Sequence, residues 1–237
     1  MATRATVQVI IDRALGELGI QSGTVGVTNQ EQNVAQALAL LQSLGQDAVA
    51  VHDWQFLMET ANYTGDSSTT AFPMPSDFGR IVNQTEWALN NKRPMIGPLS
   101  PQQWGWTQYG IVSVGVYFRY RILDDNFTIF PVPGAGEEFA FFYIKKNWLL
   151  DETNTPKSSI TAGSDVVLFD DRLMVSGLKL RIWAAKGFDT TQLASEYNFQ
   201  LQAQKGQDQG APVIQLSGTD GFHYIDTSNV PDGSWGV

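Results

Sequence analysis

The chain has 237 residues, a net charge of −9, no cysteine, and 16% charged residues against roughly 25% in an average soluble protein. The excess of acidic residues excludes tight wrapping of nucleic acid, and the lack of cysteine excludes disulfides, thiolate catalysis and cysteine metal sites. No apolar run approaches the ~20 residues of a membrane span, so we expect a chain without a membrane segment that is made in a cytoplasm.

Two helices are predicted in the N-terminal part of the chain. Over residues 4–19 the apolar side chains recur at helical spacing, and Thr3 or Thr6 can cap the start. A second helix is predicted from a capping box at residue 28 to about residue 51. A short connection between two amphipathic helices predicts an antiparallel pair.

Short strands separated by turn residues are predicted over residues 53–164. The densest stretch, residues 117–148, predicts three consecutive strands. Asp124 and Asp125 predict a turn, because short polar side chains bond locally and tolerate left-handed backbone. Ser100 followed by a proline predicts one short helix within this region.

A second helix pair is predicted over residues 165–205. Asp165 or Asp170 can begin the first of these helices, and Gly187 can end it. Apolar residues at i, i+4 and i+8 mark the second helix, namely Leu193, Tyr197 and Leu201.

These elements predict an α+β fold. The N-terminal and C-terminal helix pairs form a helical bundle, and a central antiparallel β-sandwich or barrel-like domain lies between them in the sequence. The predicted segments are 1–52 for the first helix pair, 53–164 for the β domain, 165–205 for the second helix pair and 206–237 for an extended C-terminal tail.

The predicted tail carries scattered apolar residues that cannot bury themselves alone. It is either disordered or ordered against a partner by strand addition, and both readings stay open. The candidate partner-docking residues are Val213, Ile214, Leu216, Phe222, Tyr224, Ile225 and Trp235.

The sequence contains no recognisable catalytic, cofactor or metal motif. His52 and His223 lack metal-ligand spacing, and no nucleophile elbow, phosphate-binding loop or dinucleotide fingerprint occurs. Adjacent carboxylates point to opposite faces of a strand, so they favour turns and caps over acid–base catalysis. The adjacent pairs are Asp124-Asp125, Glu137-Glu138 and Asp170-Asp171. We therefore expect no catalytic residue, no cofactor and no metal.

Two tryptophans, Trp104 and Trp106, lie in a glutamine-rich segment and are candidate exposed aromatic contacts. Exposed indoles could stack on sugars or bases. The alternative is that one of them anchors the segment to the core.

An ordered set of segments resembles the head-to-tail connector adaptors of short-tailed bacteriophages, the tail tubular protein A-like and packaged-DNA-stabilisation-like proteins. The resemblance covers about residues 4–205, and the order of the segments carries it, since no single motif is specific. The segments are the N-terminal helix pair, Asp53-Trp54-Gln55-Phe56-Leu57, Phe72-Pro73-Met74-Pro75-Ser76-Asp77-Phe78 leading to Arg80, Trp87, Tyr120-Arg121-Ile122, Phe130-Pro131-Val132-Pro133, Phe142-Tyr143-Ile144 running to Trp148, and the late helix pair from Leu168 to Lys205.

The resemblance implies a structural, non-enzymatic virion protein in the neck or tail. Such adaptors form a ring of about twelve copies beneath the portal protein ring and extend the DNA channel for genome retention and ejection. They present a platform for a tail nozzle or fibre protein. Double-stranded DNA would pass without sequence-specific contact, which agrees with the acidic balance of the chain.

Two alternative functions stay open. A peptidoglycan-degrading tail protein would use Glu86, Glu137 or Glu138 as the candidate acid, although the sequence offers no pair of carboxylates with cleft geometry. A carbohydrate- or receptor-binding β-module would use Trp104, Trp106 and Tyr109.

Overall fold

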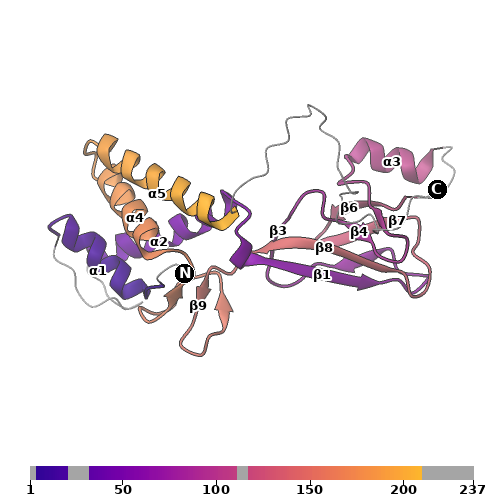
Figure 1. Cartoon of the computed structure of the whole chain (residues 1–237), viewed down its shortest axis with the longest axis horizontal. Helices are drawn as coiled ribbons and strands as arrows, with labels where there is room; N and C mark the ends of the chain where they lie inside the picture. Colours follow the sequence, from indigo (N-terminus) through magenta and orange to yellow (C-terminus); the bar gives the residue numbers. More distant parts are fainter. Residues whose placement is uncertain (1–3, 21–31, 111–116, 210–237) are drawn as a thin grey trace, which may run out of the picture.

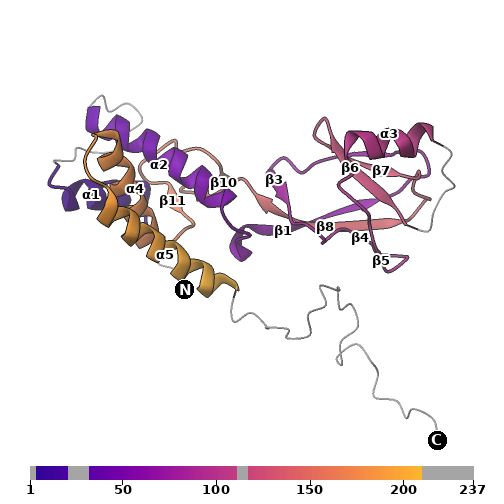
Figure 2. The ribbon, with the colours of Figure 1, turned by 90° about the horizontal axis from the view of Figure 1, so that it is seen from above.

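The structure is a computed structural model that describes residues 4–20, 32–110 and 117–209. Figures 1 and 2 show an elongated molecule with a helical lobe at one end and a β lobe at the other. The helical lobe contains α1 (Val7–Glu17), α2 (Gln32–Ala50), α4 (Asp171–Ala185) and α5 (Thr191–Gln209), and the β lobe contains α3 (Pro101–Tyr109). The predicted α+β class is confirmed.

Helix α1 begins where the sequence predicts a cap. The side chain of Thr6 accepts a hydrogen bond from the backbone N–H of Val9. Two further N–H groups of the first turn donate to the carbonyls of Asp165 and Gly163, at 2.8 and 2.9 Å. These bonds satisfy donors that a helix N-terminus leaves without an internal partner. Thr3 and the predicted capping box at residue 28 lie outside the described residues.

Helix α4 is the centre of the helical lobe, because α1, α2 and α5 all pack on it. Asp170 caps α4 as predicted, and Gly187 follows its end with φ +75°. Most of its length is buried, including the polar Ser176 and Lys179. Helices α1 and α2 contact α4 more extensively than they contact each other, so α4 holds the bundle together.

The β lobe consists of two antiparallel sheets. In the first, β8 (Glu138–Lys145) lies between β1 (Met58–Thr64) on one side and β3 (Phe78–Ile81) and β4 (Trp87–Ala88) on the other, and β4 also pairs with β5 (Arg93–Pro94). In the second, β7 (Asn126–Phe130) lies between β2 (Ala71–Pro73) and β6 (Arg119–Leu123).

The three consecutive strands predicted over 117–148 are present as β6, β7 and β8. Asp124 and Asp125 turn β6 into β7 with φ of 49° and 56°, as predicted. Strand β8 follows this β6–β7 hairpin in the sequence but pairs in the other sheet. The chain therefore crosses from one sheet to the other between β7 and β8.

The two sheets share one aromatic core, as in a β-sandwich. An isolated parallel bridge between Ile96 and Arg119 also joins the sheets at one edge. Closure into a barrel stays a prediction. The buried core residues are Ala61, Phe72, Ala88, Met95, Tyr120, Phe127, Ile129, Phe139, Phe141 and Tyr143.

Strands β1 and β8 join the two lobes (Figure 1). Phe139 and Phe141 of β8 lie in the β core, whereas Ile144, near its end, lies in the helical core. Trp148 and Leu149 continue into the helical core. A small sheet of β9 (Leu149–Leu150), β10 (Pro156–Lys157) and β11 (Val166–Val167) follows. The predicted domain boundaries stay a prediction.

Helix α5 continues through Gln209, so the prediction that the tail begins at residue 206 is wrong for residues 206–209. Gly206 after Lys205 is typical of a helix end, but the last turn of α5 is held by Asp208, which accepts a hydrogen bond from the backbone N–H of Gln55, just before β1. Among the described residues, no helix is long and apolar enough to cross a membrane.

Candidate partner-binding surfaces

Helix α3 carries the most exposed aromatic side chains of the β lobe. Ser100 and Gln103 form a capping box with Pro101 at the first helical position, as predicted. Trp106 is 64% exposed and Tyr109 is 93% exposed. Residues three apart lie on the same helix face. We call these two residues the α3 aromatic face.

The two predicted aromatic contacts differ in exposure. Trp106 is in the α3 aromatic face, whereas Trp104 is half-buried. Nearby in the sequence, Tyr117 is half-exposed, and the guanidinium of Arg93 lies over its ring, 5.6 Å from the ring centroid. Large amphipathic side chains that protrude from a rigid helix are typical of protein or glycan contacts.

The carboxylates considered for acid–base chemistry occupy structural positions. Glu86 is buried and accepts a hydrogen bond of 2.5 Å from the hydroxyl of Tyr120. Burial, together with the Glu86 carboxylate, raises the pKa of Tyr120 well above its usual range, so the phenol stays protonated and donates. Glu137 accepts from the amide of Asn91, and Glu138 is exposed at the start of β8. Glu86 therefore serves the packing of the β core, and Glu137 holds a neighbouring loop.

No group of three or more histidine, cysteine, aspartate or glutamate side chains that could hold a metal occurs within the described ranges. His52 is half-buried and packs edge-on against Trp54, with ring centroids 4.8 Å apart. Its Nε2 lies 3.3 Å from Oδ2 of Asp208, without the alignment of a hydrogen bond. His223 lies outside the described residues.

Ion pairs hold the helices of the helical lobe to α4. Lys179 bonds Glu17 of α1 at 2.7 Å and lies 3.3 Å from Glu196 of α5. Arg181 pairs with Asp47 of α2. Burial alone would lower the pKa of the Lys179 ammonium, but its two carboxylate partners outweigh burial and raise that pKa. These ion pairs therefore connect α4 to α1, α2 and α5 within the helical lobe.

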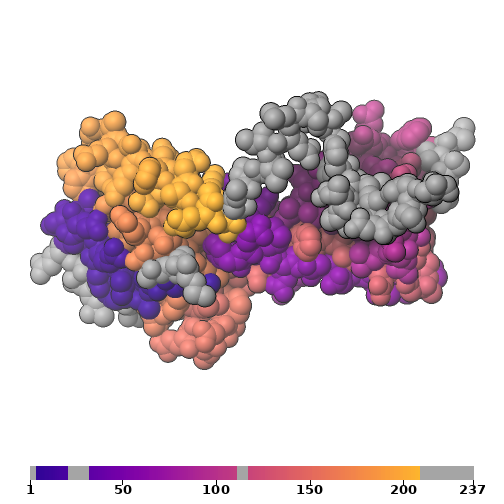
Figure 3. Space-filling view, in the orientation of Figure 1, coloured from indigo at the N-terminus to yellow at the C-terminus, as the bar shows by residue number. Residues whose placement is uncertain are grey.

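The exposed residues of α5 are uncharged except for Glu196, which pairs with Lys179 of α4. Figure 3 shows α5 on the outside of the helical lobe. We define the α5 outer face as six uncharged exposed residues of the helix, namely Gln192, Ser195, Asn198, Phe199, Gln202 and Gly206. Phe199 is 71% exposed at the centre of this face. A neutral polar surface around one aromatic residue resembles the core and rim of a protein interface.

The sequence analysis did not identify Phe199 as a candidate contact. The signal was present: Phe199 lies off the stripe formed by Leu193, Tyr197 and Leu201, which faces the lobe. An aromatic residue away from the buried stripe of an amphipathic helix is a candidate contact.

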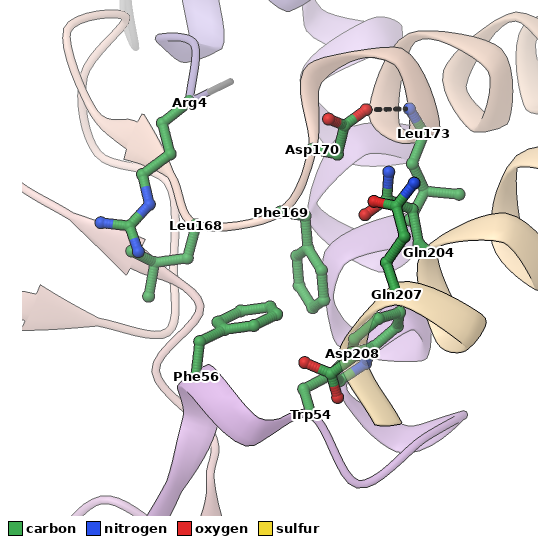
Figure 4. Close-up of a pocket in the computed structure, with 10 residues that line it drawn as sticks. All are labelled: Arg4, Trp54, Phe56, Leu168, Phe169, Asp170, Leu173, Gln204, Gln207 and Asp208. Carbon is green, nitrogen blue, oxygen red and sulfur yellow. Dashed lines mark hydrogen bonds between the residues drawn. The ribbon is translucent and has the colours of Figure 1, made fainter. Parts of the chain in front are cut away.

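A cavity of about 510 Å³ lies where α5, the segment just before β1 and the start of α4 meet (Figure 4). Its base is aromatic: the rings of Trp54, Phe56 and Phe169 are 5.4–5.7 Å apart. Trp54 and Phe169 are buried, and Phe56 is 37% exposed. Figure 4 shows Gln204, Gln207 and Asp208 of α5 on one side, and Arg4 and Leu168 on the other.

The charged residues of the cavity differ in how they are engaged. Asp208 accepts from the backbone N–H of Gln55, and Asp170 accepts from two N–H groups at the start of α4. No hydrogen bond or ion pair joins Arg4 to another described residue. Arg4 is therefore the free charge of the cavity among the described residues.

The seven predicted docking residues of the tail, Val213 to Trp235, all lie outside the described residues. Their role as a docking segment stays a prediction.

Comparison with known proteins identifies one family. The model of the family described as SU10 adaptor protein matches residues 5–217, which include both lobes. No curated protein sequence matches the chain.

Proposed function

The chain belongs to the SU10 adaptor protein family, and we propose that it forms a head-to-tail adaptor ring between the portal and the tail of a bacteriophage. Family membership makes the chain a structural phage adaptor protein located in the virion neck. The family match across residues 5–217 is the observation that carries the proposal, since it covers the helical and the β lobe together. About twelve copies in a ring, and an extended DNA channel, belong to the proposal.

The α5 outer face supports self-association. A ring needs a heterologous interface in which one patch meets a different patch of the next copy. The exposed Glu196, which lies beside the α5 outer face, is paired with Lys179 of α4, and the residues of the face itself are uncharged, which makes the face easier to desolvate. Phe199 would be the anchor of this interface.

The charge distribution supports passage of DNA without adhesion. Six of the 15 basic residues are in ion pairs within the chain: Arg13, Arg80, Lys145, Lys157, Lys179 and Arg181. Each phosphate contact would need a free Lys or Arg that releases a counterion. A net charge of −9, with six of the cations already paired within the chain, therefore favours a channel wall over a DNA-binding surface.

The α3 aromatic face supports contact with a second virion component. It lies in the β lobe, far from the α5 outer face along the molecule (Figure 1). In the proposal, the helical lobe forms the ring and faces the portal, and the β lobe contacts a tail nozzle or fibre protein.

Negative-stain electron microscopy of cognate portal rings, alone and with the purified protein, tests the proposal. We expect an added ring-shaped layer at one end of the portal particle. Portal particles of unchanged shape at micromolar adaptor concentrations would contradict it.

A carbohydrate- or receptor-binding function is the second candidate, and the exposure of Trp106 and Tyr109 favours it. An exposed aromatic pair on a rigid helix can stack on sugar rings. A glycan-array signal that is lost in Trp106→Ala and kept in Trp104→Ala would support this function. A blank array would remove it.

A further inference from the structure

The cavity at the end of α5 is poised to receive the chain that follows α5. We propose that residues 212–216 of the same chain occupy this cavity, with Val213 and Ile214 on the aromatic base formed by Trp54, Phe56 and Phe169. The occupant is a peptide segment of this chain, and the inference concerns the isolated protein, so it stands apart from ring assembly.

The first argument is where the described chain ends. Gln207 and Asp208, which line the cavity, are within two residues of Gln209, the end of α5. Ile214 lies five positions after Gln209, a stretch that can span up to ~17 Å when extended. A segment tethered so close has an effective concentration on the order of millimolar, which exceeds that of any free competitor in dilute solution.

The second argument is apolar complementarity. The segment Pro212-Val213-Ile214-Gln215-Leu216 concentrates three aliphatic side chains directly after α5. The cavity volume of about 510 Å³ corresponds to roughly 17 water molecules at ~30 Å³ each. Replacing water over an aromatic base by aliphatic side chains is favourable, and Phe56 is the part of that base that solvent still reaches.

The third argument is charge. Residues 210–237 contain Asp220, Asp226 and Asp232 and no lysine or arginine. The carboxylates of the cavity are engaged with backbone N–H groups, whereas Arg4 at the rim is free among the described residues. Residues 212–216 are themselves uncharged, and the chain that follows them is acidic, so it would be attracted to Arg4, the one cation of the cavity lining.

Disulfide trapping in the full chain tests the proposal. The chain has no cysteine, so an introduced pair reacts without background. Leu168→Cys lies on the side of the cavity opposite α5, and Gln215→Cys lies within the segment (Figure 4). A disulfide requires Cα atoms within ~7 Å, so its formation across the cavity reports occupancy. We expect an intramolecular disulfide under mild oxidation at low micromolar protein.

The matched control keeps the tether and removes the apolar contacts: the same cysteine pair with Val213→Ser and Ile214→Ser. We expect the disulfide to form at least tenfold faster without these serines. Equal rates would overturn the proposal, because tether length alone would then explain the reaction. A disulfide mainly between chains would also overturn it, in favour of a segment from a neighbouring copy. If Leu168→Cys impairs folding, Phe56→Cys with the same partner and control replaces it.

A charge variant tests the role of Arg4. We expect Arg4→Glu to slow the disulfide severalfold, while Arg172→Glu, an exposed arginine outside the cavity lining, leaves the rate unchanged. Equal effects of the two variants would overturn the assignment of Arg4.

Discussion

Trp148 occupies the space that any side chain at Gly45 would need. A Cβ atom built on Gly45 would lie 2.4 Å from the Trp148 ring, which is closer than van der Waals contact allows. The indole N–H of Trp148 also donates to the carbonyl of Ser158 at 3.1 Å. The glycine in the interior of α2 thus leaves room for Trp148, three residues after β8, to pack in the helical core.

We predict that Gly45→Ala destabilises the protein by about 1–3 kcal/mol, although alanine is the better helix former by ~1 kcal/mol. The ring of Trp148 is fully buried and cannot move aside cheaply. Gly16→Ala in α1 is the matched control, because no atom lies within 4 Å of its added Cβ. Urea denaturation should show Gly16→Ala at or above wild-type stability; equal stability of both variants would contradict the packing argument.

We predict that removing the cation Lys179 costs less folding stability than removing its two carboxylate partners, Glu17 and Glu196. Lys179→Met replaces a mostly buried side chain by an apolar one, and Glu17 and Glu196 are half-exposed and can return to water. We expect a cost of about 1 kcal/mol or less. Glu17→Gln with Glu196→Gln strands a mostly buried ammonium and should cost about 2–4 kcal/mol. Chemical denaturation measures the loss of folding stability in the two variants. A larger loss of stability in Lys179→Met than in the double glutamine variant would refute this account.

We expect Asp165 to cause part of the loss of folding stability at acid pH. Burial alone would raise the pKa of this carboxyl, but Lys157, at 2.5 Å, and the N–H groups of Thr161 and Ala162 outweigh burial and lower it. Since the folded pKa lies below the unfolded value of ~3.9, the stabilisation is fully present above pH ~4 and is lost as pH falls through the folded pKa.

Asp165→Asn should therefore lower stability at pH 7 by about 2–4 kcal/mol and flatten its pH dependence below pH 4. Asp124→Asn, at the exposed turn between β6 and β7, is the control. Melting temperatures between pH 2 and pH 7 test this prediction, and an unchanged acid slope in Asp165→Asn would show that other carboxylates carry the effect.

Phe199→Asp should separate assembly from folding. Phe199 is 71% exposed, so the substitution should change folding stability by no more than ~0.5 kcal/mol. A carboxylate at the centre of a desolvated interface should weaken recruitment to portal rings at least tenfold. Leu123→Asp, an exposed aliphatic residue of the β lobe, is the charge-matched control. Equal recruitment of both variants would remove the α5 outer face from the ring interface.

Local features of the fold could be predicted from the sequence. The caps at Thr6, Ser100 and Asp170 depend on side chains next to the helix they start, and the turn at Asp124 and Asp125 depends on two adjacent residues. The α+β class followed from the same local patterns. These features need no knowledge of distant contacts.

Contacts between distant segments could not be predicted in the same way. Strand β8 pairs with β1 across about 80 residues, and its switch of sheet after β7 has no local pattern. The end of α5 was placed too early because Asp208 is held by Gln55, from the other half of the chain. The cavity likewise combines Phe56, Phe169 and Gln207, so it exists only in the folded chain.

Native mass spectrometry of the purified protein, with and without its cognate portal ring, tests the central claim most directly. We predict a complex that carries about one adaptor chain per portal subunit, as a closed ring with matched symmetry requires. A monomer or small oligomer that leaves the portal mass unchanged would contradict the adaptor-ring account.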